Sequence, residues 1–482
     1  MLKTTLHRGY YQRSARFFDK IIQNFLRGAE MRDLRGTKTR RLISVLLAIT
    51  MVLCITASVP LSASAVTTDK VQSGLTYTDE YGEWTYELTD SGDGYKITDY
   101  DESKTDIEIP SVIDGIPVTE IGEDAFYYCY YLESITIPDS VTTIGEYAFA
   151  ECPDLASITL PNNLTTIGAY AFSGCERLRN ITLPNSVTTI GNKAFDDCYN
   201  LTDITIPNSV TTIGNAAFQF CYNLESITIP NSVTTIGSSI FNYCEGLESV
   251  TLPDNMTAIT YGMFYQCVNL KSITIPDNVT IIKENAFWGC SSLSNVTIPD
   301  SVKTIGQHAF SDCSSLTNVT LPNSVTTISH YTFQGCSSLT NVTIPNSVTT
   351  IGYQTFSGCS SLTNITLPNS VTSINRYAFE NCSNLTNVYY TGSEDEWNNI
   401  SIYDANECLT NATIHYNYVP PTPGDISGDG ELAVDDVIYL LKYIVCDIEL
   451  TEQQLENADL NNDGEFSVID AILIQRMLIA AV

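Results

Sequence analysis

Oxygen-bearing side chains recur at matching positions in two 12-residue segments near the C-terminus, 425–436 and 459–470. Hard cations such as Ca²⁺ take six to eight oxygen ligands, and a 12-residue loop supplies them from positions 1, 3, 5, 7, 9 and 12, with glycine at position 6. At position 9 of the first segment Ala433 offers no side-chain oxygen, and water serves there. We predict two bound Ca²⁺ ions with these ligands: Asp425, Ser427, Asp429, Glu431, Asp436, Asp459, Asn461, Asp463, Glu465, Ser467 and Asp470.

Thiols form a second regular set, because twelve cysteines follow one another at intervals of 23 residues. A repeat position of this kind is neither a disulfide framework nor a set of isolated metal ligands. Free cysteine behaves as a small buried hydrophobe, so we predict a reduced, buried packing ladder. Thiol or metal chemistry is the alternative, although no histidine or acidic residue recurs in phase with the ladder. Its members are Cys129, Cys152, Cys175, Cys198, Cys221, Cys244, Cys267, Cys290, Cys313, Cys336, Cys359 and Cys382.

Catalytic residues do not form a comparable set. Glycoside hydrolysis needs two carboxylates held across a cleft, but the acidic residues of the repeats are scattered over variable positions. His308, His330 and His415 have no recurring serine or aspartate partner. The segments that flank the repeats are too short for a catalytic domain. We therefore predict that the protein is not an enzyme.

The 23-residue unit has the internal pattern of a solenoid. In the unit that begins at Leu201, residues 204–206 alternate as in a strand with isoleucine inward and threonine outward. Residues 210–213 begin a second apolar edge, and residues 217–221 have the inward spacing of one helical turn. A unit this short cannot bury its apolar face alone, so neighbouring units must stack.

The repeat resembles the BspA-like leucine-rich repeat of bacterial surface proteins. The resemblance rests on the recurring pattern Leu-x-x-Ile-x-Ile-Pro-x-x-Val-x-x-Ile-Gly-x-x-Ala-Phe-x-x-Cys, and it implies an α/β solenoid of about twelve repeats over residues 119–385. Ile240 departs from the pattern at its alanine, and Thr260, Ser329 and Asn375 depart from it at the glycine. We interpret these departures as tolerated packing variants.

Both ends of the repeat array differ from its middle, as caps must. Residues 83–88 and 95–98 alternate and are joined by a Gly-, Asp- and Ser-rich segment, which predicts a hairpin within an N-terminal cap over 66–118. Residues 386–418 resemble the usual C-terminal cap of such arrays. Trp84 and Trp397 lie in these caps, where we expect them to seal the core, with sugar binding as the alternative.

After a proline-rich linker at 419–424, residues 425–482 resemble a type I dockerin. The resemblance rests on two calcium loops with aspartate at position 12, each followed by a predicted helix (437–445 and 471–480). It implies an all-α calcium-binding domain that binds a cohesin domain of a cellulosomal scaffoldin through loop positions 10 and 11 and the following helix. A calcium-stabilised stalk without a partner is the alternative. The implied contacts are Val434, Asp435, Lys442, Val468, Ile469 and Arg476.

Tyrosine is concentrated in the first seven repeats, after the glycine and around the cysteine of each unit. Aromatic side chains are favoured contact anchors because they combine apolar area with a polar tip. We predict a recognition face there, with Trp288 at its edge, although tyrosine that only covers the ridge between coils is an equally good interpretation. The face comprises Tyr127, Tyr128, Tyr131, Tyr147, Tyr170, Tyr199, Tyr222, Tyr243 and Tyr265.

The first 65 residues have the features of a secretory signal: arginines at 40–41, an apolar run over 42–59 and the small residues 63–65. Met31 is a plausible true start, and a membrane anchor is the alternative. These 65 residues hold 11 Lys and Arg and 3 Asp and Glu, so the chain after them keeps 12 basic and 52 acidic residues, a formal net charge of −40. That charge excludes nucleic acid as a partner, since binding requires cations on the protein.

Together these features predict a secreted, extracellular protein without a membrane span after cleavage, attached to a free or cell-surface cellulosome. Two non-enzymatic functions fit. In the first, the array binds a polysaccharide or another protein. In the second, the chain is a cell-surface adhesin or a spacer displayed through the dockerin.

Overall fold

The computed structural model describes residues 74–101, 104–419, 424–427, 432–445, 448–460 and 466–480. The predicted signal segment, residues 1–65, lies outside them. Within the described part of the chain, no helix is long and apolar enough to cross a lipid bilayer.

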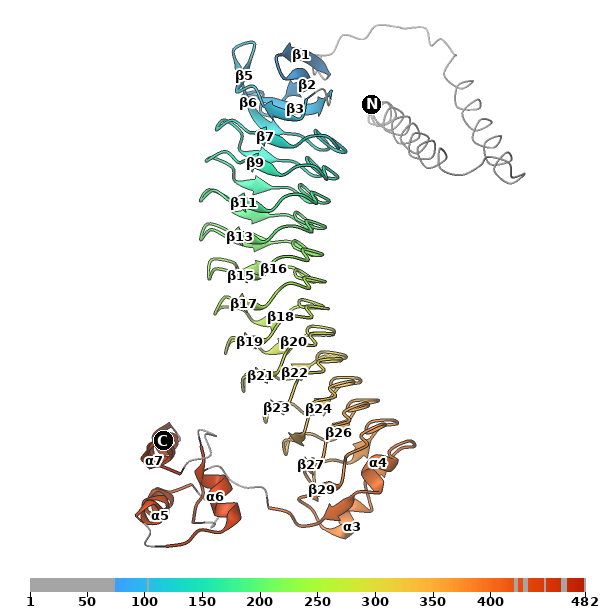
Figure 1. Ribbon diagram of the computed structural model, residues 1–482, viewed down its shortest axis with the longest axis vertical. Helices are drawn as coiled ribbons and strands as arrows, with labels where there is room; N and C mark the ends of the chain where they lie inside the picture. The colour runs from blue at the N-terminus through green and yellow to red at the C-terminus, as the bar shows by residue number, and fades with distance from the viewer. Residues whose placement is uncertain are drawn as a thin grey trace, which may run out of the picture. The chain divides into compact units, whose positions relative to one another are not determined.

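The repeats form a stack of coils in which each coil adds one short parallel strand to a row (Figure 1). Hydrogen bonding divides this row into four sheets, with interruptions after its third, fifth and seventh strands. The pairing advances by one repeat, so that Ile181 lies opposite Ile204. In most of these strands the middle residue is buried and the flanking threonine is exposed, as the alternation predicts. The strands are β4 (Asp106–Glu108), β7 (Ser134–Thr136), β9 (Ser157–Thr159), β11 (Asn180–Thr182), β13 (Asp203–Thr205), β15 (Ser226–Thr228), β17 (Ser249–Thr251), β19 (Ser272–Thr274), β21 (Asn295–Thr297), β23 (Asn318–Thr320), β25 (Asn341–Thr343), β27 (Asn364–Leu367), β29 (Asn387–Tyr390) and β31 (Thr413–His415).

A second row of parallel strands follows the next edge of each coil. It is continuous from β6 to β16, then interrupted between β16 and β18 and again between β22 and β24. The row consists of β6 (Ile116–Ile121), β8 (Thr143–Ile144), β10 (Thr166–Ile167), β12 (Thr189–Ile190), β14 (Thr212–Ile213), β16 (Thr235–Ile236), β18 (Ala258–Ile259), β20 (Ile281–Ile282), β22 (Thr304–Ile305), β24 (Thr327–Ile328), β26 (Thr350–Ile351), β28 (Ser373–Ile374) and β30 (Ser401–Ile402).

Glycine follows this second row because the coils approach each other most closely there. A Cβ atom on Gly168 would lie 2.5 Å from the backbone carbon of Gly145 in the preceding coil. The two interruptions of the sheet fall at Thr260 and Ser329, where the glycine is replaced. The hydroxyl of Ser329 donates to Ile305 O at 2.6 Å. In the regular coils the equivalent carbonyl accepts a hydrogen bond from the backbone N–H of the glycine in the next coil, as Ile282 O does from Gly306 N.

The third side of each coil consists of turns instead of the helical turn that the spacing of residues 217–221 predicts. Each coil places two residues in the left-handed region, for example Tyr147 at φ 52° and Glu151 at φ 58°. A left-handed residue interrupts a right-handed helix, so the segment closes through consecutive turns. Phe218 and Cys221 still point inward and are fully buried. The solenoid with its 23-residue period is as predicted, and only this side differs in detail.

A column of twelve phenylalanines fills the core, one from each coil. Neighbouring rings are stacked, with centroids 4.8–5.9 Å apart and interplanar angles of 1–19°. Because each ring contacts the rings above and below, burial is shared along the whole stack.

The ends of the core are closed by tryptophan. Strands β1 (Leu75–Asp79), β2 (Gly82–Leu88) and β3 (Tyr95–Tyr100) form an antiparallel meander, which includes the predicted hairpin, and β5 (Val112–Ile113) pairs with β6. Trp84 is fully buried, with its ring centroid 4.7 Å from that of Tyr100 and 6.3 Å from that of Phe126. At the other end, Trp397 of helix α3 (Glu394–Trp397) packs on Tyr390, before the short helix α4 (Glu407–Thr410). Both tryptophans are therefore core-sealing residues, and neither is available to stack on a sugar.

The C-terminal module contains the helices α5 (Val434–Ile444), α6 (Glu452–Ala458) and α7 (Val468–Ala480). Thr451 caps α6 and Gln454 reaches back to its N–H at 3.0 Å, as the capping-box sequence predicts. Helices α5 and α7 each begin three residues earlier than the sequence indicates, because the last positions of each loop form the first helical turn. A small core of Ile426, Leu440, Ala458, Ala471 and Ile474 joins the halves.

Candidate binding sites

The first loop of the C-terminal module is closed by the carboxylate of Asp436. This side chain is fully buried at the start of α5. Its Oδ1 accepts hydrogen bonds from the N–H groups of Ile426 and Ser427, each at 2.8 Å, and its Oδ2 accepts one from Ala433 N at 2.7 Å. Asp436, at position 12, thereby holds the beginning and the end of the loop together.

Asp470 has the same role in the second loop. It is fully buried, its Oδ1 accepts from Leu460 N at 3.2 Å, and its Oδ2 accepts from Ser467 N at 3.0 Å and from the Ser467 hydroxyl at 3.2 Å. The two halves of the module are thus built alike, which agrees with their matching sequences.

Helix α6 connects to the first loop through its polar side chains. Asn457 Nδ2 donates to Asp425 O at 2.6 Å, and Gln454 Nε2 donates to Ile426 O at 2.7 Å. The Asp425 carboxylate is buried and accepts from the Ser427 hydroxyl at 3.2 Å. The helix between the loops therefore fixes the position of the first predicted ligand.

The oxygen ligands that the structure describes are of the kind that bind a calcium ion. Carboxylates and hydroxyls are the hard oxygen ligands that Ca²⁺ prefers, and buried carboxylates at 425, 436 and 470 are stable only when paired or hydrogen-bonded. Of the predicted ligands, the structure describes Asp425, Ser427, Asp436, Asp459, Ser467 and Asp470. The remaining predicted ligands lie outside the described residues: Asp429, Glu431, Asn461, Asp463 and Glu465.

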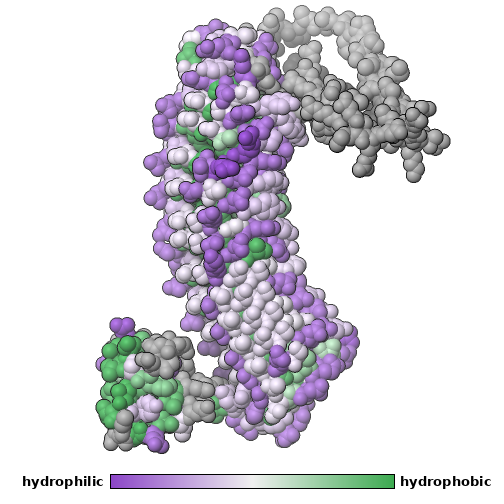
Figure 2. All heavy atoms as spheres, in the orientation of Figure 1, coloured by the Kyte–Doolittle hydropathy of each residue, from purple (hydrophilic) through white to green (hydrophobic). Residues whose placement is uncertain are grey.

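Apolar side chains on α5 and α7 are exposed on the surface of the module (Figure 2). The six predicted cohesin contacts, Val434, Asp435, Lys442, Val468, Ile469 and Arg476, are all exposed. The structure adds exposed residues that the loop-position rule does not include: Ile438, Leu441, Val445, Ile472 and Met477. The sequence could have indicated them, because the two halves match at an offset of 34 residues. Ile438 and Ile472 therefore occupy equivalent positions. An apolar face of this kind marks an interaction site.

The twelve ladder cysteines are free and buried, as predicted. From Cys152 onward, each thiol donates to the backbone carbonyl of the phenylalanine 26 residues earlier, as in Cys221 Sγ to Phe195 O at 3.2 Å. Burial raises the pKa of nine of these thiols, for Cys382 to about 12. A thiol that does not ionise is a poor nucleophile and metal ligand, so the ladder is structural.

The predicted tyrosines are largely half-buried and lie on the turn side of the coils in two groups. Tyr127, Tyr128, Tyr147 and Tyr170 contact one another in the first coils, with ring centroids 4.0–6.0 Å apart. Tyr131 is the most exposed of the nine, at 59%. The remaining four predicted tyrosines belong to a longer row.

This row, the aromatic row, extends well beyond Trp288, where the prediction placed its edge. Its neighbouring ring centroids are 4.3–6.0 Å apart, and Trp288 stacks on His308 at 4.7 Å. Counting tyrosine alone missed it, because phenylalanine, tryptophan and histidine also belong to the row and its members occupy five different positions of the repeat. The row comprises Tyr199, Tyr222, Phe220, Tyr243, Tyr265, Trp288, His308, Tyr331, Tyr353 and Tyr377.

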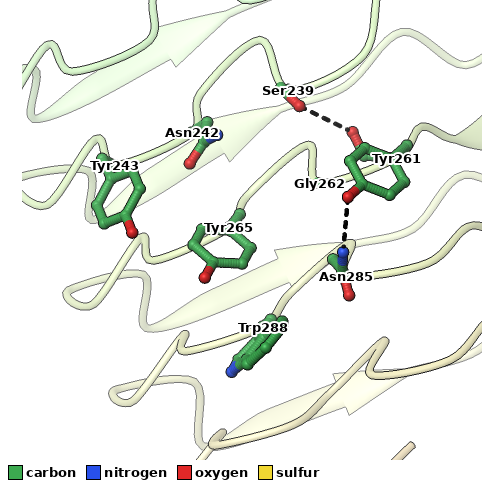
Figure 3. A pocket seen from close by; sticks show the side chains of 8 residues that line it. All are labelled: Ser239, Asn242, Tyr243, Tyr261, Gly262, Tyr265, Asn285 and Trp288. Atoms are coloured by element: carbon green, nitrogen blue, oxygen red, sulfur yellow. Dashed lines mark hydrogen bonds between the residues drawn. The ribbon is translucent and has the colours of Figure 1, made fainter.

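A pocket of about 340 Å³ opens beside the middle of the aromatic row (Figure 3). Asn285 Nδ2 donates to the Tyr261 hydroxyl at 3.0 Å, and Ser239 Oγ donates to Tyr261 O at 3.4 Å. The lining comes from successive coils and consists of Ser239, Asn242, Tyr243, Tyr261, Gly262, Tyr265, Asn285 and Trp288.

Comparison with protein families identifies both parts of the chain. The family described as BspA type leucine rich repeat region matches residues 119–248, 165–294, 211–339 and 282–410. The dockerin type I domain matches residues 423–479. The protein belongs to the BspA-type leucine-rich repeat family and carries a type I dockerin domain. Type I dockerins bind Ca²⁺, and the two parts support an interaction role of the cellulosomal type.

Solved structures with similar coils come from several bacteria. A leucine-rich cell surface protein of Faecalibacterium prausnitzii is 31% identical over 68% of this chain and 98% of its own, with a TM-score of 0.45. A leucine-rich repeat protein of Bacteroides ovatus is 28% identical over 70% and 100%, with a TM-score of 0.44. The pneumococcal vaccine antigen PcpA is 23% identical over 72% and 98%, with a TM-score of 0.52, and shares the fold. Among curated proteins the comparison found no match.

Proposed function

We propose that this protein is a secreted, non-catalytic component of a cellulosome. Its dockerin attaches it through Ca²⁺-dependent contacts to a cohesin domain of a scaffoldin, and its repeat array recognises a polysaccharide or protein target during polysaccharide degradation. The observation that carries the proposal is the pair of buried loop-closing carboxylates, each beside a helix whose outer face is apolar and exposed.

Two Ca²⁺ ions are expected, one in each loop. Residues 425, 427, 429, 431 and 436 would hold the first, and residues 459, 461, 463, 465, 467 and 470 the second. A bound ion supplies positive charge against carboxylates that would otherwise repel one another. The chain's own contribution is to aim them: Asp436 and Asp470 join loop to helix, and Asn457 fixes the backbone of Asp425.

The cohesin-binding surface consists of the exposed residues of α5 and α7. Lys442 and Arg476 occupy equivalent places in the two halves, and so do Ile438 and Ile472. At another equivalent position the first half has Asp435 and the second half has Ile469. Because the two faces are unlike, we expect them to bind one cohesin with different affinities, not interchangeably.

Calorimetric titration of the chain from residue 66 with Ca²⁺ and with a panel of cohesin domains tests the dockerin function. We expect two Ca²⁺ ions per chain, one in Asp436→Asn, and cohesin binding only with Ca²⁺ present. The Ile438→Asp, Ile472→Asp double variant should weaken cohesin binding at least about tenfold, because it places charge in an apolar contact. Glu449→Gln, exposed but outside both helices, is the control. A calcium-loaded chain that binds none of the cohesins would refute the attachment.

The array's function is tested by retention of the same chain on insoluble cellulose, xylan and pectin. Serine at Tyr199, Tyr222, Tyr243 and Tyr265 together should abolish retention if the aromatic row is the recognition face. Unchanged retention would exclude the row, and flow-through of the unaltered chain would direct the search to secreted and cell-surface proteins.

A further inference from the structure

The pocket beside the aromatic row exists because one repeat position changes size along the stack. This position holds the first left-handed residue of each coil, and its backbone is alike throughout, with φ between 52° and 60°. Its side chain is large at Tyr147, Tyr170 and Tyr331. It is small at Ser239, Gly262 and Asn285, the three coils that line the pocket.

The core under the pocket is also altered. Ile240 and Met263 stand where other coils have alanine, and both are fully buried. Thr260 replaces the regular glycine, its hydroxyl donates to Gly237 O at 2.8 Å, and the second sheet is interrupted there. Two of the four departures that we interpret from the sequence as packing variants, Ile240 and Thr260, therefore lie in the coils of the pocket, whereas Ser329 and Asn375 belong to later coils.

The pocket contains a polar atom that needs a partner. Asn242 Oδ1 is buried without a hydrogen-bond partner among the residues that the structure describes. Leaving such an acceptor unpaired is unfavourable, so a ligand that donates an O–H or N–H to it would gain affinity. The Tyr261 hydroxyl accepts from Asn285, which leaves its own hydrogen free to donate to the same ligand.

The aromatic walls of the pocket are held in place. Trp288 Nε1 donates to Asp312 Oδ2 at 2.9 Å, and one face of the indole is covered by His308 with the rings 9° from parallel. The Tyr265 ring stands edge-on to Trp288 at 5.2 Å. Rigid rings offer apolar contact at low cost in conformational entropy.

The charge of the site excludes anions. Every side chain in the lining is neutral, and the flanking Glu284 and Asp312 are carboxylates whose field acts on the adjacent His308. Asp312 already accepts the hydrogen bond from Trp288 Nε1. The lining itself offers amide and hydroxyl groups, but it has no carboxylate that could bind a cationic ligand.

We propose that this pocket binds a neutral sugar unit of a polysaccharide, with Asn242, Tyr261 and Asn285 hydrogen-bonding its hydroxyls and with Tyr265 and Trp288 contacting its apolar face. This proposal rests on the proposed recognition of a polysaccharide by the array, and it locates that recognition in the pocket. The volume lies at the low end of small-molecule sites, ~300–1,000 Å³, which suits a short segment of a chain.

Two variants test the pocket with little risk to the fold. Gly262→Tyr fills it, and the same backbone position carries tyrosine in the coils of Tyr147, Tyr170 and Tyr331. Trp288→Ser removes a wall, and serine occupies the equivalent position at Ser173, Ser311 and Ser357. Tyr403→Ser, exposed in the C-terminal cap and outside both the aromatic row and the pocket, is the matched control. Circular dichroism and thermal melting verify the folding of each variant.

The measurement is affinity electrophoresis and calorimetry of the calcium-loaded chain from residue 66 with soluble xylan, mixed-linkage β-glucan and galactomannan. Polygalacturonate is the anionic comparison and a lysine-rich peptide the cationic one. We expect at least one neutral polysaccharide to bind, with affinity at least about tenfold lower in Gly262→Tyr and Trp288→Ser and within about twofold in Tyr403→Ser.

The other outcomes separate the two proposals. Neutral polysaccharide that binds both pocket variants normally would overturn the pocket and leave polysaccharide recognition by the array intact. Binding of only polygalacturonate or only the peptide would overturn the neutral-sugar assignment. A chain that binds cohesin but none of the probes would overturn both the pocket and the polysaccharide target, while the attachment function stands.

Discussion

At the residue scale, the cysteine ladder solves a hydrogen-bonding problem that the repeat creates. The turn after each phenylalanine leaves its carbonyl facing the core of the next coil, where the thiol of that coil donates to it. Alanine would leave the carbonyl with one hydrogen bond, from the backbone N–H of the cysteine in its own coil, such as Cys198 N to Phe195 O at 3.3 Å. Cysteine combines a small apolar body with a weak donor, which suits a position that is fully buried.

The ladder thiol therefore contributes to stability. Replacing Cys221 with alanine removes its bond to Phe195 O and opens a small cavity, so we expect a loss of about 1–3 kcal/mol in the free energy of unfolding. Cys408→Ala, half-buried and outside the ladder, is the control with a smaller effect. Denaturant unfolding measures both, and equal losses would contradict the role of the ladder bond.

Asp196 makes stability depend on pH. Burial raises the pKa of its carboxyl to about 6 although Lys193 Nζ lies 3.0 Å from Oδ2. Oδ1 has no hydrogen-bond partner among the described residues. A raised acid pKa means that the folded state binds the proton more tightly. The stabilisation is therefore full below the unfolded value near 3.8 and is lost as pH rises through about 6.

In Asp196→Asn this pH dependence should disappear. Relative to the unaltered chain, the variant should gain up to roughly 3 kcal/mol of stability between pH 4 and pH 7. Denaturation midpoints at the two pH values, with Asp277→Asn as an exposed control, give the comparison. If the difference in stability between Asp196→Asn and the unaltered chain were the same at both pH values, Asp196 would not titrate in this range.

At the element scale, the closest approach of the coils limits what the second row of strands accepts. A Cβ atom on Gly191 would lie 2.5 Å from Ala169 N and from Gly168 C. Where the sequence places threonine or serine at this point, the sheet is interrupted, at Thr260 and at Ser329. Lys283 and Asn375 also replace the glycine and are accommodated, each with its N–H bond to the preceding coil (Ile259 O and Ile351 O) kept at 3.0 Å.

Gly191→Ala should accordingly destabilise the array by about 1–3 kcal/mol, because the preceding coil must move. Gly358→Ala is the control. Its backbone is left-handed at φ 80°, yet the nearest atoms are 3.6 Å away and equivalent coils carry Glu151 and Asp197 in the same region. Thermal melting should separate the two variants, and a larger loss in Gly358→Ala would contradict the packing argument.

At the scale of the whole molecule, the array and the dockerin depend on different forces. The array is held by stacked aromatic rings, parallel strands and a continuous apolar core. The dockerin has a small core of five buried residues and carboxylates aimed into its loops. Small domains with little core usually need a metal or disulfides, so calcium should matter for one part only.

Removing Ca²⁺ with a chelator should therefore abolish cohesin binding and reduce the helical signal of the dockerin. Polysaccharide retention and the melting transition of the array should not change. Circular dichroism and retention assays on one sample, with Mg²⁺ added as the control ion, make the measurement. Loss of retention on chelation would reveal a calcium requirement within the array.

The sequence by itself determined the solenoid, its period, the inward ladders and the paired calcium loops. Each depends on a local spacing that repeats, and twelve copies of one pattern leave a single way to stack. The cap hairpin, the buried Trp84 and the capping box at Thr451 also follow from short segments.

Tertiary structure alone decided what neighbouring coils bring together. Left-handed residues at positions such as Tyr147 replaced the predicted helical turn, and no residue type marks that conformation, because nine different residue types occupy the position in the twelve coils. The aromatic row and the pocket arise because residues 23 positions apart become neighbours, so a count along the chain does not find them. The apolar outer face of α5 and α7 appears only once the small core has selected which sides of the helices it buries.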